Sequence, residues 1–131
     1  MRLKSFTLSY GTQFLKALSD ESRVRILHLI FKNKEMCTSD IEHVLDFTQT
    51  KTSRHLTYLR NANLIAPRKE DQWVYYYIKD EAADFVQQIL SYFDKDPQLS
   101  RDLEIFNTLY SNRELAIYQM RNRRYFSGSS A

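Results

Sequence analysis

Hydrophobic side chains recur at intervals of three and four residues over most of the chain, which is typical of amphipathic α-helices. In the second predicted helix this stripe is formed by Val24, Leu27 and Ile30. The six predicted helices span about residues 5–18, 21–32, 40–46, 49–62, 80–95 and 97–120. We therefore expect a mostly helical chain.

Only one part of the chain has the pattern of a β-hairpin. Residues 64–69 and 73–78 flank Glu70-Asp71-Gln72, and the second run consists entirely of β-branched and aromatic residues, in which Val74, Tyr76 and Ile78 alternate with Trp73, Tyr75 and Tyr77. Residues that are β-branched or aromatic favour strands. The two runs predict a two-stranded hairpin between the fourth and fifth helices.

Polar residues between the segments predict where the helices begin and end. The expected N-caps are Asp20, Thr48, Asp80 and the pair Ser39 and Glu42, which has the spacing of a capping box. Asn63 is expected to end the fourth helix in the left-handed conformation, and Pro97 suits the first position of the last helix.

The composition narrows the fold class further. The chain has 131 residues with only two Gly, two Pro and one Cys, which argues against a β-sandwich, a barrel or a disulfide framework. A hydrophobic content of 43% is too high for a disordered chain, and no apolar run reaches the ~20 residues that span a bilayer. Because the first residues also lack a secretion signal, we expect a soluble, cytoplasmic protein.

The order of the elements, with a short helix, a longer helix and then a hairpin, is that of a winged helix-turn-helix. The predicted fold class is mainly α with a two-stranded β wing and a C-terminal helical extension. Residues 1–95 are expected to form a DNA-binding domain, residues 96–120 a further helix, and residues 121–131 a flexible basic tail.

Charge is unevenly distributed along this unit, although the formal net charge is only +3. Residues 49–69 carry five basic side chains and no acid, whereas residues 35–46 carry four acids and no Lys or Arg. A basic face is typical of proteins that bind a polyanion, although charge runs are also common on solvated faces.

The longer helix has an outer face suited to base edges and phosphates. With Thr52, Leu56 and Leu59 facing the core, polar side chains remain outside, and a major groove about 12 Å wide admits one helix. The predicted DNA-binding residues are Gln49, Thr50, Lys51, Ser53 and Arg54 on this helix, with Arg68, Lys69 and Gln72 on the hairpin. The alternative is a polar solvent face.

Three segments resemble, in the right order, sequences of the ArsR/SmtB family of bacterial repressors. They are Phe14–Leu27 (FLKALSDESRVRIL), Thr48–Arg60 (TQTKTSRHLTYLR) and Trp73–Ile78 (WVYYYI), within a resemblance that covers about residues 12–95. The resemblance implies a homodimer that binds an imperfect inverted repeat in double-stranded DNA. Residues 1–95 are then the DNA-binding and dimerisation domain, and the helix in residues 96–120 is expected to pack on the dimer interface. It also implies that the dimer represses transcription until an inducer binds.

By position, the resemblance matches four residues to those that contact bases and phosphates in the family, namely Gln49, Thr50, Ser53 and Arg54. Asn63 and Asp71 stand where the family often has Gly. Because Asn and Asp tolerate a left-handed backbone better than other residues with a side chain, both turns are expected to form.

The two common metal sites of the family lack their ligands in this sequence. Met36–Asp40 resembles the segment with paired cysteines, but Ser39 replaces the second cysteine, and Cys37 alone cannot supply the three or four ligands of a soft metal. Residues 80–95 contain no His, which the other site uses. No metal site and no cofactor are therefore predicted. Cys37 is expected to be a buried small hydrophobe, with an intersubunit disulfide or a reactive thiol as alternatives.

Two other questions stay open at the level of sequence. The aromatic residues Tyr10, Phe14, Phe85, Tyr92, Phe93, Phe106 and Tyr110 suit core or dimer packing, or else a pocket for an apolar organic inducer. The competing function is a winged-helix module that binds proteins and not DNA, with Trp73 as an anchor. An enzyme is disfavoured, since the sequence has no phosphate loop, metal-ligand cluster or nucleophile–base pair.

Overall fold

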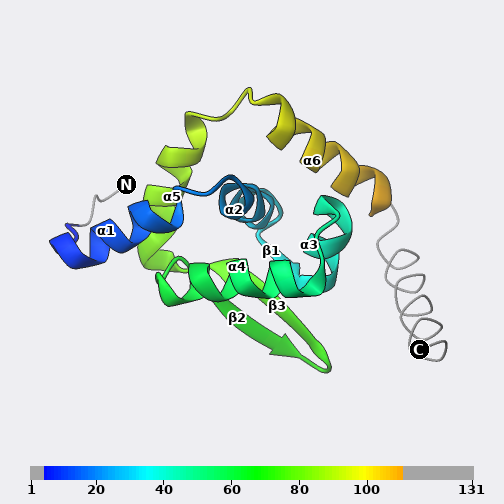
Figure 1. The fold of residues 1–131 in the computed structure, drawn as a ribbon, viewed down its shortest axis with the longest axis horizontal. Helices are drawn as coiled ribbons and strands as arrows, with labels where there is room; N and C mark the ends of the chain where they lie inside the picture. The colour runs from blue at the N-terminus through cyan, green and yellow to red at the C-terminus, as the bar shows by residue number, and fades with distance from the viewer. Residues whose placement is uncertain (1–4, 111–131) are drawn as a thin grey trace.

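The computed structural model describes residues 5–110, which form six helices and one small antiparallel sheet (Figure 1). The helices are α1 (Leu8–Ala17), α2 (Glu21–Asn33), α3 (Thr38–Leu45), α4 (Gln49–Asn61), α5 (Asp80–Ser91) and α6 (Pro97–Leu109). The strands are β1 (Glu35–Cys37), β2 (Ile65–Glu70) and β3 (Trp73–Ile78). The predictions for residues 111–120 and for the tail 121–131 lie outside the described residues.

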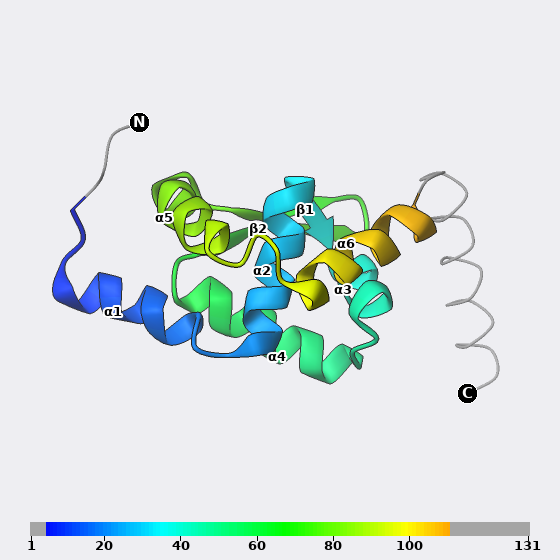
Figure 2. The ribbon, with the colours of Figure 1, turned by 90° about the horizontal axis from the view of Figure 1, so that it is seen from above.

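Helix α2 forms the centre of the core. Its side chains Ile26, Leu27, Leu29 and Ile30 are fully buried, and α2 packs against α4, α5, α6 and the sheet. Figure 2 shows α2 between α5 on one side and α3 and α6 on the other. The central position of α2 explains why the periodicity of this segment was clear in the sequence, since nearly every apolar residue in it is covered.

The sheet has three strands and not the two that the sequence predicted. Strands β2 and β3 form the expected hairpin, in which Arg68 pairs with Tyr75, and β1 pairs with the other edge of β3. Three residues, from Glu35 to Cys37, are too few to show the alternation by which a strand is recognised. The class that was predicted, a mainly helical chain with a β wing, is confirmed with this addition.

Two of the expected N-caps form as predicted. The side chain of Asp20 accepts a hydrogen bond from the backbone N–H of Arg23, and that of Thr48 accepts one from Lys51, each at 3.1 Å. Pro97 is the first residue of α6, as predicted, and Asp96 caps that helix.

The other two predicted caps are wrong. Helix α3 begins at Thr38 after Cys37, which makes no side-chain cap bond, so Ser39 lies inside the helix. Similarly, Asp80 is the first residue of α5 and not its cap, which is Lys79. In both places the helix begins before the residue that was expected to cap it, at Thr38 and at Asp80.

Within residues 5–110, four residues with side chains adopt a positive φ, each in a connection that follows a helix or strand. Asn63 (φ 67°) and Asp71 (φ 55°) are the two predicted positions, and Lys34 and Asp46 complete the set. Asp46 ends α3 in the left-handed conformation and so turns the chain towards α4. Polar residues thus replace Gly at these turns at modest cost.

Helix α6 packs along α2 and α3, on the side of the molecule away from α1 (Figures 1 and 2). An ion pair between Arg25 of α2 and the fully buried Asp102 of α6 holds it there, with both hydrogen bonds at 3.0 Å. That α6 packs over an interface between two copies stays a prediction. No helix in residues 5–110 is both long and apolar enough to cross a bilayer.

Stability is expected to fall as the pH is lowered from 7.5 towards 5.5. Burial lowers the pKa of His28, and burial likewise lowers that of His55. Between its folded-state pKa and about 6.5 each residue binds a proton more readily in the unfolded chain, so unfolding takes up protons and acid favours it. Thermal unfolding of the His28→Leu variant should depend less on pH over this range, whereas an unchanged dependence would contradict the assignment to His28.

Candidate nucleic-acid interface

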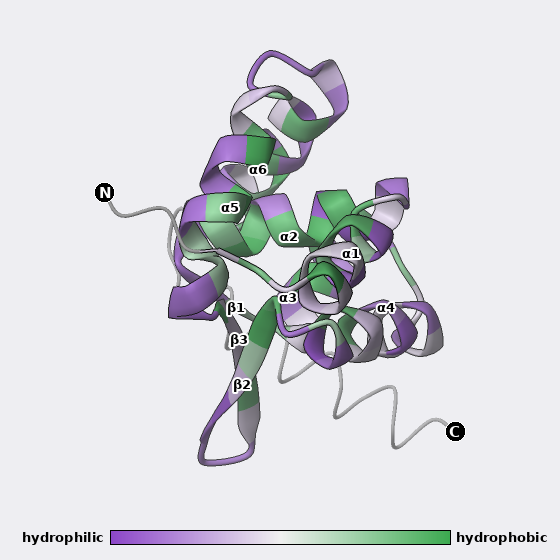
Figure 3. Ribbon diagram, turned by 90° about the vertical axis from the view of Figure 1, so that its left-hand side faces the viewer, coloured by the Kyte–Doolittle hydropathy of each residue, from purple (hydrophilic) through white to green (hydrophobic). Residues whose placement is uncertain are grey.

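Helix α4 packs on the core with one face and exposes the opposite face to solvent. Its buried side chains Thr52, His55, Leu56 and Leu59 pack on the core, and the hydroxyl of Thr52 donates a 2.9 Å hydrogen bond to the carbonyl of Thr48. The opposite face of α4 and the tip of the β2–β3 hairpin are hydrophilic (Figure 3). The predicted inward positions of this helix are therefore confirmed.

The structure brings five predicted residues together near the start of α4. Gln49, Thr50, Ser53 and Arg54 are exposed. Lys51 is half-buried, with its ammonium nitrogen 4.0 Å from the centre of the Phe47 ring. The N-terminus of a helix carries unsatisfied N–H groups and a partial positive charge, which favour an anion such as phosphate.

The β2–β3 hairpin, here called the wing, extends from the helical body on the same side as α4 (Figures 1 and 3). Lys69 lies on β2 and Gln72 in the turn; both are exposed, and their side chains make no hydrogen bond or ion pair with other residues of the described range 5–110. A cation and an amide are therefore available at the tip of the wing.

Arg68 has a different environment from the other predicted contacts. Its Nε and Nη2 atoms donate to the carboxylate of Glu35 at 3.0 and 2.8 Å, and Nη1 donates to Glu70 at 3.0 Å. The hydrogen bonds from Glu35 and Glu70 raise the pKa of the guanidinium above its usual value. The side chain also lies over the ring of Tyr75. Arg68 thus joins β2 to β1 and its charge is compensated, so a phosphate would compete with two carboxylates for it.

Arg23 connects three helices and was not singled out from the sequence. Its Nε donates to the carbonyl of Ala17 at the end of α1 at 2.7 Å, and its guanidinium carbon lies 3.9 Å from the centre of the Tyr58 ring on α4. The contacts fix α1 and α4 relative to the start of α2. One signal was present, because a cation in the first turn of a helix opposes the helix dipole and so suggests another role.

Cys37 is buried, as predicted, with 5% of its surface exposed. Burial raises the pKa of the thiol to about 12, and the nearby charge of Asp40 acts in the same direction. Because the thiolate is the form that reacts and binds metals, the raised pKa disfavours both reactions of Cys37 at neutral pH. Within residues 5–110, no three His, Cys, Asp or Glu side chains are grouped so as to hold a metal ion.

Three apolar side chains on α1 and directly after α5 are uncovered in the single chain. Leu8, Leu15 and Tyr92 are 84%, 57% and 77% exposed. The two helices pack together, since Phe14 of α1 is fully buried and contacts Phe85 of α5 at a ring-centre distance of 5.3 Å. Exposed apolar residues are available to a protein–protein interface.

A sequence model of a protein family, the bacterial regulatory proteins of the arsR family, matches residues 20–66 of the chain. These residues include α2, α3 and α4. The chain is 39% identical over 75 residues to the arsenic resistance transcriptional regulator ArsR1 of Pseudomonas putida, a match that covers 57% of this chain and 59% of the relative. It is 36% identical over 78 residues to the arsenical resistance operon repressor of Escherichia coli, which covers 60% of this chain and 67% of the relative. The chain thus matches less than two thirds of the length of ArsR1.

Among solved structures, the chain resembles the homodimeric winged helix-turn-helix DNA-binding domain of Mb0332 from Mycobacterium bovis. The TM-score is 0.61 at 25% identity, and the match covers 67% of this chain and 82% of that one. Reduced HlyU from Vibrio cholerae matches with a TM-score of 0.58 at 27% identity, over 65% of this chain and 90% of that one.

Proposed function

Because the chain belongs to the arsR family of bacterial regulatory proteins, we propose that it is a sequence-specific DNA-binding repressor of transcription. In this proposal α4 enters the major groove and the wing contacts the flanking backbone. The observation that carries the proposal is that α4 and the wing lie on the same side of the molecule (Figures 1 and 3), and that both carry exposed polar and basic residues. Gln49, Thr50 and Ser53 can bond base edges, and Lys51, Arg54 and Lys69 can neutralise phosphates.

We propose that the active form is a homodimer that binds an inverted repeat. The exposed apolar side chains on α1 and directly after α5, Leu8, Leu15 and Tyr92, support an interface between two copies. Two recognition helices about 34 Å apart would meet successive major grooves on one face of the duplex. Arg23 contacts both α1 and α4, so the position of α1 at such an interface would determine the position of α4 in each protomer.

Binding to operator DNA is expected to weaken steeply with salt. Lys51, Arg54 and Lys69, the proposed phosphate contacts of each protomer that form no ion pair among residues 5–110, give six contacts per dimer. The expected slope of log K against log salt is therefore about −5. Fluorescence anisotropy with the duplex upstream of the protein's own gene measures this slope. A slope near zero, or no binding to any duplex, would contradict the proposal and favour the protein-interaction module.

We also propose that the regulator responds to a small-molecule inducer and not to a metal at the usual sites of the family. Cys37 is the one thiol of the chain and is buried in its protonated form, which supports this part of the proposal. Zn²⁺, Cd²⁺ and arsenite at tenfold excess over the dimer are expected to change operator affinity by less than about twofold. Stoichiometric metal binding that releases DNA, measured by anisotropy, would show that this part is wrong.

A further inference from the structure

We propose that a cleft between the start of α2 and the connection from α5 to α6 is a binding site for a small organic cation. The cleft has a volume of about 260 Å³ and lies at the junction of α1, α2 and α6. It is just below the range of roughly 300–1,000 Å³ for small-molecule sites, so the expected ligand is small. The inference is independent of the DNA-binding proposal, because ligand binding is measured without DNA.

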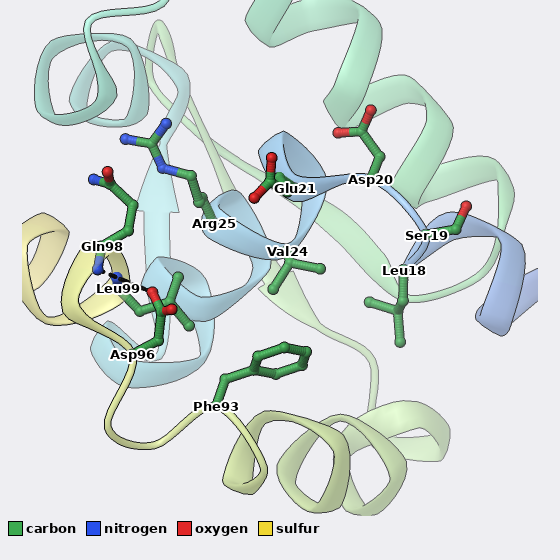
Figure 4. A pocket seen from close by; sticks show the side chains of 10 residues that line it. All are labelled: Leu18, Ser19, Asp20, Glu21, Val24, Arg25, Phe93, Asp96, Gln98 and Leu99. Atoms are coloured by element: carbon green, nitrogen blue, oxygen red, sulfur yellow. Dashed lines mark hydrogen bonds between the residues drawn. The ribbon is translucent and has the colours of Figure 1, made fainter.

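Apolar side chains form the wall of the cleft. Leu18, Val24, Phe93 and Leu99 come from four different segments of the chain and surround one opening (Figure 4). Phe93 is 42% exposed, so part of its surface is available to a ligand. An apolar wall with a few polar groups along its edge is the usual composition of a small-molecule site.

The charge along the edge of the cleft is negative. Glu21 is exposed, and its carboxylate has no hydrogen-bond or ion-pair partner among residues 5–110. Asp20 and Asp96 also line the cleft, where each caps the N-terminus of a helix. The carboxylate of Glu21 is therefore the acidic group available to a ligand.

The one basic residue of the cleft does not offset this charge. The guanidinium of Arg25 is held by both carboxylate oxygens of Asp102, at 3.0 Å each. Gln98, also at the edge, donates to the same carboxylate at 2.9 Å. The N-termini of α2 and α6 also border the cleft, and the carboxylates of Asp20 and Asp96 that cap them offset their partial positive charge. With Arg25 paired as well, the carboxylate of Glu21 makes the site favour a cation over an anion.

The shared chemistry of the expected ligands is a protonated amine on a compact hydrophobic body. The ammonium group would bond Glu21, and the body would contact Val24, Leu99 and the ring of Phe93, which can also attract a cation through its face. A neutral molecule of the same shape would keep only the apolar contacts, and an anion would be repelled by Glu21.

The test uses three probes of similar shape and different charge, namely phenethylamine, 2-phenylethanol and 3-phenylpropionate. Titration of the full-length protein, followed by ¹H–¹⁵N NMR, is expected to give saturable shifts for phenethylamine that include the side-chain amide of Gln98. The amine should bind at least about fivefold more tightly than the alcohol, and the acid more weakly still. No saturable shift, or equal affinity for the three probes, would overturn the proposal.

Two variants test whether the carboxylate of Glu21 is the group that makes the site prefer the amine. Glu21→Gln should reduce phenethylamine affinity about fivefold and leave 2-phenylethanol affinity unchanged. Glu104→Gln, at an exposed position of α6 outside the cleft, is the matched control and should change neither. Circular dichroism spectra of the two variants serve as the control that both remain folded. Unchanged amine affinity in Glu21→Gln, or an equal loss in both variants, would also overturn the proposal.

Discussion

Replacing Arg54 by Ala is expected to weaken operator binding by about 10- to 100-fold while the protein remains folded and dimeric. Arg54 is exposed near the start of α4, and its side chain makes no ion pair with the other residues of 5–110. Its loss therefore removes a DNA contact without breaking a contact in the fold. Fluorescence anisotropy at fixed salt measures the affinity, and sedimentation measures the oligomeric state.

Arg60→Ala is the matched control for Arg54→Ala. Arg60 is also exposed on α4, but it lies in the last turn, six residues further from the N-terminus that would enter the groove. Its replacement is expected to change operator affinity by less than about threefold. Equal losses in the two variants would indicate that only total charge matters, and no loss in Arg54→Ala would remove the role assigned to this residue.

Replacing Asp102 by Ala is expected to destabilise the protein by about 3 kcal/mol. Asp102 is fully buried and accepts hydrogen bonds from Arg25 and from Gln98, so its removal leaves donors of both side chains without an acceptor. The value is at the lower end for a broken buried ion pair because the side chain of Arg25 is 25% exposed and water can reach it.

Urea denaturation measures the free energy of unfolding for this variant. Glu104→Ala, at an exposed position on the same helix, is the control and should change the free energy of unfolding by less than about 0.5 kcal/mol. If Asp102→Ala were as stable as the control, α6 would not be held to α2 by this ion pair.

The sequence predicted the elements that are stabilised locally. Helices with a clear apolar stripe and a capping side chain, such as the helix that begins after Asp20, were placed to within a few residues. The turn residues Asn63 and Asp71 were also predicted, because a positive φ is restricted to few residue types. The exposed positions of α4 followed from the same periodicity, since Thr52, Leu56 and Leu59 define its inner face.

The sequence could not predict features that depend on pairs of residues far apart in the chain. Glu35 meets Arg68 only because β1 joins the sheet, and this ion pair gives Arg68 a structural contact besides the DNA contact that was predicted for it. Likewise, nothing local to Asp102 showed that it would be buried against Arg25, 77 residues earlier in the chain. In each case the partner is provided by tertiary structure.

Selection of bound sequences from a pool of random duplex DNA tests the central claim most directly. We predict enrichment of an inverted repeat whose half-site centres lie about 10 base pairs, or roughly 34 Å, apart. The Arg54→Ala variant, run in parallel, should lose this enrichment. Recovery of no common sequence by the unaltered protein, or of single half-sites without a partner, would contradict a dimer that reads DNA with α4.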